Sequence, residues 1–127
     1  MANASDPSTY PGSNVNNESF HAAVYYREKK AGVLTKTRAG YEFVYDPEYL
    51  AEPGARPISL SLPLRVEKYE SSRLFSFFEG LLPEGWLLDL ISATVKIDKN
   101  DKFRLLLHTG RDPLGAVSIR PAEGKQE

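Results

Sequence analysis

Two histidines and a few pairs of acidic residues are the side chains in this 127-residue sequence that could support acid–base or metal chemistry. His21 and His108 have no carboxylate at the spacing of a metal-ligand set, and the chain has no Cys to supply a thiolate. Acidic pairs such as Asp98 with Asp101 could act as a general acid and base, but they flank the start of an expected helix, where carboxylates cap the backbone and complement the helix dipole. The sequence therefore predicts no catalytic residue, no metal site and no cofactor.

Two stretches resemble phosphate-handling motifs but lack the reactive residues. Segment 80–85 has the two glycines of a Walker loop, but Trp86 and Leu87 stand where Lys and Ser or Thr would contact phosphate and magnesium. Segment 110–112 shares Arg-Asp with the kinase catalytic loop, but Val117 stands where that loop requires a metal-binding Asn. The sequence also has no Gly-rich loop and no Asp-Phe-Gly. We therefore expect that this chain is not an enzyme and does not transfer phosphate by itself.

Segment 86–97 carries the strongest signal for binding another protein. At about 100° per residue its apolar side chains cover an arc of roughly 220°, and only Asp89, Ser92 and Lys96 form a polar stripe. A helix on the surface of one domain needs an apolar stripe of only roughly 100°. The extra apolar surface must be covered by the rest of the domain or by a second protein. The lone Trp86 could therefore belong to the core, as Trp often does, or anchor an interface.

The elements around this segment predict an α+β domain, with strands first and helices second. Aromatic and β-branched runs separated by turns indicate a small antiparallel meander with short later strands, and amphipathic spacing indicates about three C-terminal helices packed with it. The expected strands are 20–27, 31–37, 40–45, 58–62 and 115–119, with a turn or short helix at 46–50. The expected helices run from Ser71 or Ser72 to 82, from a first turn with Pro83 to 97, and from Asp98 or Asn100 to Gly110.

Composition indicates the domain boundaries and the localisation. Residues 1–19 are rich in Ser and Asn and have almost nothing to bury, so we expect a disordered leader, then one domain at 20–121 and a polar tail at 122–127. The 16 basic and 17 acidic residues give a net charge of −1, which argues against direct contact with nucleic acid. No apolar run approaches the roughly 20 residues of a membrane helix, and no secretory signal is present, so we expect a cytoplasmic protein.

Several blocks of this sequence together resemble the N-terminal subdomain of the HipA-type toxin kinases. The resemblance extends from Val24 to about Pro121, and its most specific parts are the ISLSLP and FFxxLLPEG patterns. The blocks are FVYDPEYL at 43–50, GARPISLSLPL at 54–64, FFEGLLPEG at 77–85 and GRDPLGAVSI at 110–119.

The resemblance implies a non-catalytic role. In the family this subdomain precedes a larger kinase core that holds the ATP-binding and catalytic residues, and none of those residues is present in this chain. A stand-alone copy is similar to the HipS-type component of three-part HipBST toxin–antitoxin systems. The resemblance therefore implies an antitoxin that binds and inhibits a HipT-type serine/threonine kinase in trans. It also implies a further partner, a HipB-type helix-turn-helix DNA-binding protein, in a ternary complex.

The apolar segment at 86–97 indicates where the kinase would bind. A subdomain that is separate from its kinase keeps the apolar face that packs on it, and an exposed patch of this kind marks a partner site. We hypothesise a surface anchored by Trp86 that docks near the kinase cleft. Its side chains are Leu82, Pro83, Glu84, Trp86 and Leu87, and Arg111 and Asp112 either extend it or have a structural role in a loop.

Three alternative functions stay open at this point. The chain could be the N-terminal part of a single-chain HipA-like kinase, an accessory co-repressor that touches DNA in a HipB-containing complex, or an enzyme with its own ATP turnover. The balanced charge argues against the second, and the incomplete kinase motifs argue against the third. A neighbouring gene for a kinase that lacks this subdomain would favour the antitoxin over the single-chain kinase.

Overall fold

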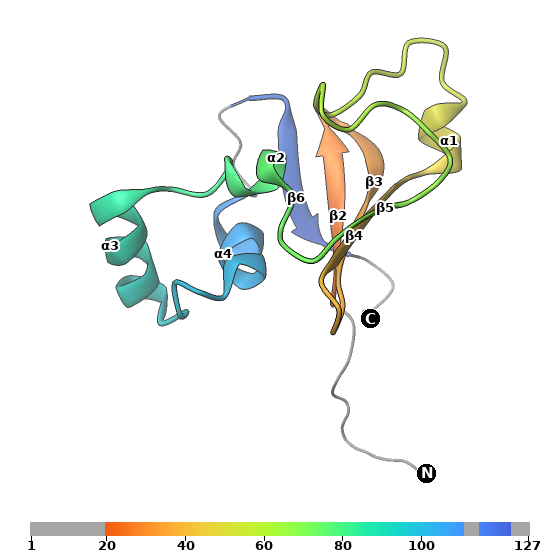
Figure 1. The fold of residues 1–127 in the computed structure, drawn as a ribbon. Helices are drawn as coiled ribbons and strands as arrows, with labels where there is room; N and C mark the ends of the chain where they lie inside the picture. Colours follow the sequence, from red (N-terminus) through yellow and green to blue (C-terminus); the bar gives the residue numbers. More distant parts are fainter. Residues whose placement is uncertain (1–19, 111–114, 123–127) are drawn as a thin grey trace.

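Five strands form one antiparallel sheet in the computed structural model, which describes residues 20–110 and 115–122 (Figure 1). In their order across the sheet they are β5 (Tyr69–Ser71), β4 (Tyr41–Tyr45), β3 (Lys29–Lys36), β2 (Phe20–Tyr26) and β6 (Val117–Pro121). The meander of β2, β3 and β4 is local in sequence, whereas β5 and β6 join its two edges from later in the chain. The predicted leader at 1–19, and the tail from 123 onward, lie outside the described residues.

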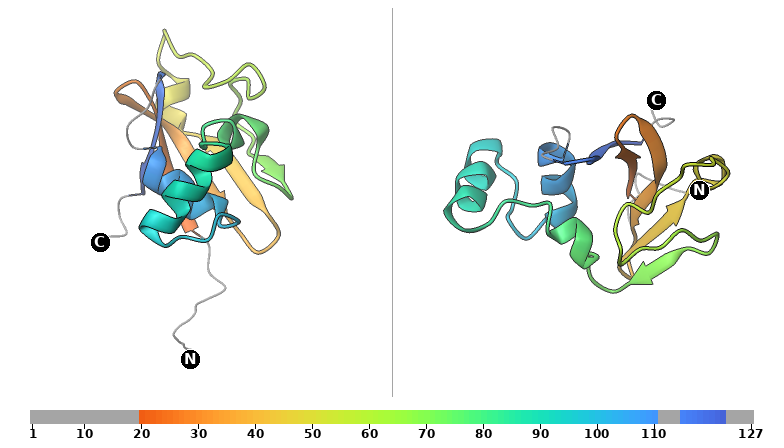
Figure 2. Two further views of the ribbon diagram at one scale, coloured as in Figure 1. Left: turned by 90° about the vertical axis from the view of Figure 1, so that its left-hand side faces the viewer. Right: turned by 90° about the horizontal axis from the view of Figure 1, so that it is seen from above.

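Four helices occur within the described residues: α1 (Pro47–Leu50), α2 (Ser76–Glu79), α3 (Gly85–Val95) and α4 (Lys102–Thr109). Helix α4 packs against β6 and α1 packs against β3, whereas α3 packs closely against no other described element. Figures 1 and 2 show α3 on the far side of α4 from the sheet. The sheet and helices together confirm the predicted α+β fold. Each helix in the described part of the chain is too short or too polar to span a lipid bilayer.

The core lies on one face of the sheet. Along β4, Phe43 and Tyr45 are buried while Val44 between them is exposed, as the alternation of a strand requires. Phe78 of α2 covers this face, with its ring centroid 5.7 Å from that of Phe43. The largest fully buried side chains are Tyr45, Phe43, Phe78, Leu34, Leu105, Leu106, Ile119 and Val24.

The strand predicted at 58–62 is wrong, because this segment is a tight turn. In a strand, Ile58, Leu60 and Leu62 would share one face. Here the Tyr45 hydroxyl accepts a hydrogen bond from the Ile58 N–H at 3.0 Å and donates one to the Leu62 carbonyl. Both ends of the turn are therefore pinned to the core, and Leu60 at its tip is 95% exposed.

The single helix predicted from 71 or 72 to 82 is also wrong. The chain as far as Ser71 pairs with β4, and Phe75 is still extended at φ −58° and ψ 141°. The helix therefore begins only at Ser76 and ends at Glu79. The apolar residues of this stretch reach the core from an irregular backbone, so their helical spacing did not require a continuous helix.

Helix α3 begins later and ends earlier than predicted. Pro83 lies outside the helix, because Glu84 is its N-cap and Gly85, at φ +59°, is its first residue. Lys96 adopts a left-handed conformation at φ +61°, which ends the helix at Val95.

Helix α4 is capped by a different residue from the one expected. The Asp101 carboxylate accepts a hydrogen bond from the Arg104 N–H at 3.3 Å. The Asp98 carboxylate accepts from the Asn100 N–H at 2.8 Å, so it stabilises the preceding turn and cannot cap the helix. The predicted end of this helix at Gly110 is confirmed.

Candidate partner-binding surface

Helix α3 exposes a set of large apolar side chains. Trp86 is 75% exposed, Leu90 is 53% exposed and Leu87 is 41% exposed, and no residue of α3 is fully buried. We call these three side chains the docking face. Large apolar side chains that are contiguous and exposed on a small domain mark a site of interaction with another molecule. The interpretation of Trp86 as a core residue is therefore wrong for this structure.

The C-terminal half of α3 is joined by polar contacts to the residues that follow it. The Lys99 ammonium pairs with the Asp89 carboxylate at 3.1 Å, which folds the following loop back along the helix. The Ser92 hydroxyl donates a hydrogen bond to the Ile97 carbonyl, and Ile97 itself is buried. Polar contacts therefore help to hold the helix that carries the docking face, and its Leu88, Ile91 and Val95 are partly buried.

An apolar groove of about 580 Å³ lies beside the docking face. Three of the predicted interface residues, Leu82, Pro83 and Leu87, line it together. Its other lining residues come from β2, from the turn at 58–62, from α2 and the residues after it, from α3, and from the chain on both sides of the segment 111–114. Those residues are Tyr26, Ile58, Phe77, Gly80, Leu81, Ile91, Thr109, Gly110, Gly115, Ala116 and Val117.

Two other predicted residues, Glu84 and Trp86, lie outside the groove. Glu84 is exposed, and its side chain makes no capping hydrogen bond to α3. Trp86 belongs to the docking face and precedes Leu87, which belongs to both the docking face and the groove. Arg111 and Asp112 lie outside the residues that the structure describes.

One wall of the groove is tied to the core through Tyr45. Its hydroxyl accepts from the N–H of Ile58, which lines the groove. Burial raises the pKa of Tyr45 to about 12, although the hydrogen bond from Ile58 acts in the opposite direction. The Tyr45 hydroxyl therefore stays protonated, and donates to the Leu62 carbonyl, at alkaline pH as well as at neutral pH. This clamp holds the groove wall in a fixed position.

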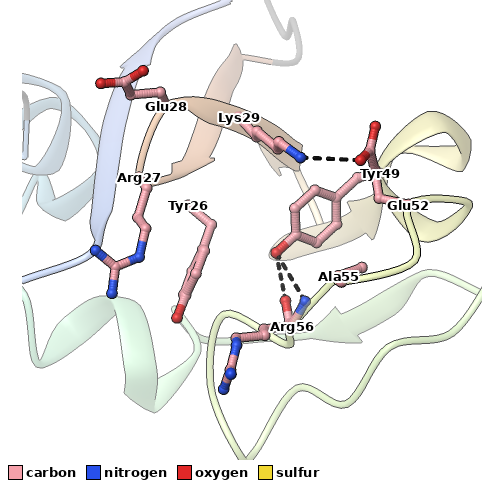
Figure 3. A pocket seen from close by; sticks show the side chains of 9 residues that line it. Tyr26, Arg27, Glu28, Lys29, Tyr49, Glu52, Ala55 and Arg56 are labelled. Carbon is pink, nitrogen blue, oxygen red and sulfur yellow. Dashed lines mark hydrogen bonds and ion pairs between the residues drawn. The ribbon is translucent and has the colours of Figure 1, made fainter.

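A second pocket, of about 500 Å³, adjoins the groove (Figure 3). It lies between the turn that joins β2 to β3 and the loop that follows α1, and Tyr26 lines both the pocket and the groove. The Tyr49 hydroxyl fixes the loop by donating to the Arg56 carbonyl at 2.5 Å and accepting from the Arg56 N–H at 3.3 Å. Sequence patterns did not single out these residues, because the two segments are remote in the chain.

The residues considered for acid–base or metal chemistry have structural contacts. His21 Nδ1 lies 3.0 Å from the Thr35 hydroxyl on the exposed face of the sheet. Asp98 and Asp101 hold a turn and a helix end, as described above. Within the described residues, no group of three or more His, Cys, Asp or Glu side chains is arranged to hold a metal ion.

The fold and this surface define a small α+β domain with an exposed apolar helix beside an apolar groove. The HipA N-terminal domain family matches residues 22–120, and the chain belongs to this family. The structure is similar to the solved N-terminal domain of HipA toxin, with a TM-score of 0.64 and 33% identity, covering 84% of this chain and 95% of that one.

Relatives contain this domain in two different settings. An uncharacterized protein of Haemophilus influenzae is 39% identical over 89 residues, which is 70% of this chain and 80% of that protein. Two proteins of Sinorhizobium fredii, putative kinase Y4mE and putative kinase Y4dM, are 30% and 31% identical over 79% and 65% of this chain. The chain spans only 24% and 22% of the length of these two relatives. The domain therefore makes up most of one relative and a minor part of the others.

Proposed function

We propose that this chain is an antitoxin of a type II toxin–antitoxin system that binds a HipT-type serine/threonine kinase in trans and inhibits it. The observation that carries the proposal is the docking face beside the apolar groove, where Trp86, Leu87 and Leu90 are exposed on α3. A kinase core is the partner that we favour, because the domain makes up only about a quarter of two longer relatives named putative kinases. In the Haemophilus relative the matched region makes up 80% of the protein, which supports the proposal that this domain can also act as a separate chain.

Trp86 is the anchor of the proposed contact. It is an exposed aromatic side chain in the first turn of α3, and interface anchors are enriched in Trp. Leu82 and Pro83 extend the apolar surface into the groove. The exposed Glu84, next to Pro83 in the chain, adds a negative charge outside the groove. The bound domain keeps the kinase inactive by wedging its cleft open or by covering its ATP site. A HipB-type DNA-binding protein joins the two in a ternary complex, and this chain makes no contact with DNA.

The test is co-expression of this chain with a HipT-type kinase. We expect the kinase to stop growth when it is expressed alone, and growth to recover with this chain present, with the two proteins purifying as a complex. Kinetics at varied ATP concentration then distinguish the two modes of inhibition. A chain that covers the ATP site competes with ATP, whereas a chain that wedges the cleft open does not need to. Continued growth arrest with no complex would contradict the antitoxin function.

A second candidate function is the N-terminal domain of a single-chain kinase. The Sinorhizobium relatives favour it, since there the same domain lies within a longer chain. The reading frame distinguishes the two candidates. A kinase core in the same frame as this domain would favour the single chain, and a separate gene for a kinase without this domain would favour the antitoxin.

A further inference from the structure

The pocket in Figure 3, which we call the arginine pocket, has unbalanced charge at one end. The Lys29 ammonium pairs with the Glu52 carboxylate at 3.0 Å, so these two charges compensate each other. Within the part of the chain that the structure describes, Arg27 and Arg56 have no ion-pair partner. Figure 3 shows the Glu28 carboxylate pointing the opposite way from the Arg27 guanidinium. Two cationic groups therefore line the pocket without a carboxylate that neutralises them.

The pocket has a third hydrogen-bond donor, the Tyr26 hydroxyl. In Figure 3 the Tyr26 hydroxyl lies between Arg27 on one side and Arg56 on the other, and all three side chains line the same pocket. Guanidinium groups bind carboxylates and phosphates through paired N–H donors, and a tyrosine hydroxyl can donate to the same oxygens. An anionic group is thus the ligand that this end of the pocket fits.

Hydrogen bonds hold the backbone that carries the two arginines before any ligand binds. The Arg27 N–H donates to the Ala116 carbonyl at 2.6 Å, which ties the β2–β3 turn to the segment before β6. The Tyr49 hydroxyl holds the backbone of Arg56 from the other side of the pocket. A site that is already ordered loses less conformational entropy on binding.

The arginine pocket adjoins the apolar groove. Tyr26 lines both cavities, and Ile58 of the groove wall is two residues from Arg56. A bound segment that fills the groove with apolar side chains would therefore bring its next residues to the two arginines. The charge and the apolar surface together specify the occupant: a segment of the partner that has an anionic side chain beside an apolar stretch.

We propose that the groove and the arginine pocket bind one such segment of the partner kinase, with Arg27, Arg56 and the Tyr26 hydroxyl holding its carboxylate or phosphate group. This inference rests on the proposed function, because it names the chemistry of the kinase segment that this chain recognises. It adds a polar, salt-sensitive contact to the apolar contact of the docking face.

The experiment measures the affinity of the full chain for the HipT-type kinase at low and high salt. The variants are Arg27→Glu, Arg56→Glu and the double variant. Arg38→Glu is the matched control, since it makes the same charge change in the β3–β4 turn, at the opposite end of β3 from Arg27. We expect each single reversal to weaken binding about tenfold at low salt and the double reversal to weaken it further, with less loss at high salt. The control stays within about twofold of the wild type, because charges at that distance are screened.

The source of the anion is distinguished by treating the kinase with a phosphatase. If the arginine variants lose affinity for treated and untreated kinase alike, the bound group is a carboxylate. If the loss disappears with the treated kinase, the bound group is a phosphate. Both results support the inference.

The inference and the proposed function fail in different ways. If Trp86→Ala weakens binding while the arginine reversals bind like Arg38→Glu, the arginine pocket has no role and the proposed function stands. If the wild-type chain does not bind the kinase at all, the proposed function is wrong and the inference is wrong with it.

Discussion

Replacement of Trp86 by Ala separates the stability of the domain from its binding. The side chain is 75% exposed in the free domain, so most of its surface is available to a partner and little of it contributes to folding. The substitution removes the ring but keeps a residue with high helix propensity at the start of α3. We therefore expect a large effect on the complex and a small effect on the fold.

The expected losses of binding free energy and of folding free energy both follow from the exposed fraction of Trp86. A Trp side chain has roughly 200 Å² of surface, so about 150 Å² is left for the partner, worth at most about 4 kcal/mol at about 25 cal/mol per Å². Part of this is offset by the cost of association, and an interface anchor is typically worth at least about 2 kcal/mol, which weakens Kd by about 30-fold. The roughly 50 Å² that is already buried is worth about 1 kcal/mol of folding free energy, a decrease in Tm of about 4–8 °C at most.

Three measurements check this prediction. Titration against the kinase gives Kd, thermal unfolding followed by circular dichroism gives Tm, and growth during co-expression gives the inhibition in cells. Phe20→Ala is the matched control, because Phe20 is also a large exposed aromatic residue, at 55%, and it lies on β2, outside the docking face and the groove. We expect the control to bind the kinase like the wild type.

Two outcomes would refute this reasoning. If Trp86→Ala folds normally and binds with unchanged Kd, the docking face is not the interface. If the variant loses several kcal/mol of folding free energy, Trp86 stabilises the domain in solution and its exposure has been misread.

Three further substitutions test the structure around the site, each by thermal or chemical unfolding. Lys96→Gly should stabilise the domain by about 1 kcal/mol, because Lys96 has a left-handed backbone at φ +61° that Gly adopts without steric cost. Tyr45→Phe should cost about 1–3 kcal/mol, since it leaves the Ile58 N–H and the Leu62 carbonyl without their partner. Burial raises the pKa of Tyr45 to about 12 from 10.0, so the wild type should lose stability as the pH rises from 10 toward 12, and Tyr45→Phe should lose less. Gly110→Ala should cost about 1–3 kcal/mol of folding free energy. Its new Cβ would lie 2.7 Å from the Leu106 carbonyl oxygen in α4 and 2.9 Å from the Ile119 side chain in β6.

Each of these expectations has a contrary result. A lower unfolding temperature for Lys96→Gly would mean that the lysine side chain makes a contact that outweighs its backbone cost. Wild-type stability of Tyr45→Phe would show that water replaces the hydroxyl, and wild-type stability of Gly110→Ala would show that α4 can move away from β6.

The meander and the exposed apolar helix α3 could be predicted because their signals are local. In β4, apolar and polar residues alternate over neighbouring positions, so the strand and its buried face follow from the sequence alone. The apolar arc of the segment 86–97 is wider than one side of a small domain can cover, and this excess predicts exposure or a partner. Helix α3 indeed exposes Trp86 and Leu90.

Strand β5 and the turn at 58–62 could not be predicted, because their conformations depend on residues far away in the chain. The three residues of β5 are too few to show a period, and they become a strand only by pairing with β4. The segment 58–62 alternates like a strand, but the hydroxyl of Tyr45 bonds both of its ends and folds it into a turn. Local secondary-structure propensity does not include hydrogen bonds between residues that are far apart in the chain.

By itself, the sequence determined the α+β class, the absence of complete phosphate-transfer motifs and the excess apolar surface of one helix, because each depends only on residue type and spacing. The tertiary structure alone decided that Leu82, Pro83 and Leu87 share one groove and that Arg27 and Arg56 share one pocket. These residues come from segments that meet only when the sheet and helices pack, and the packing depends on long-range contacts that no local pattern encodes.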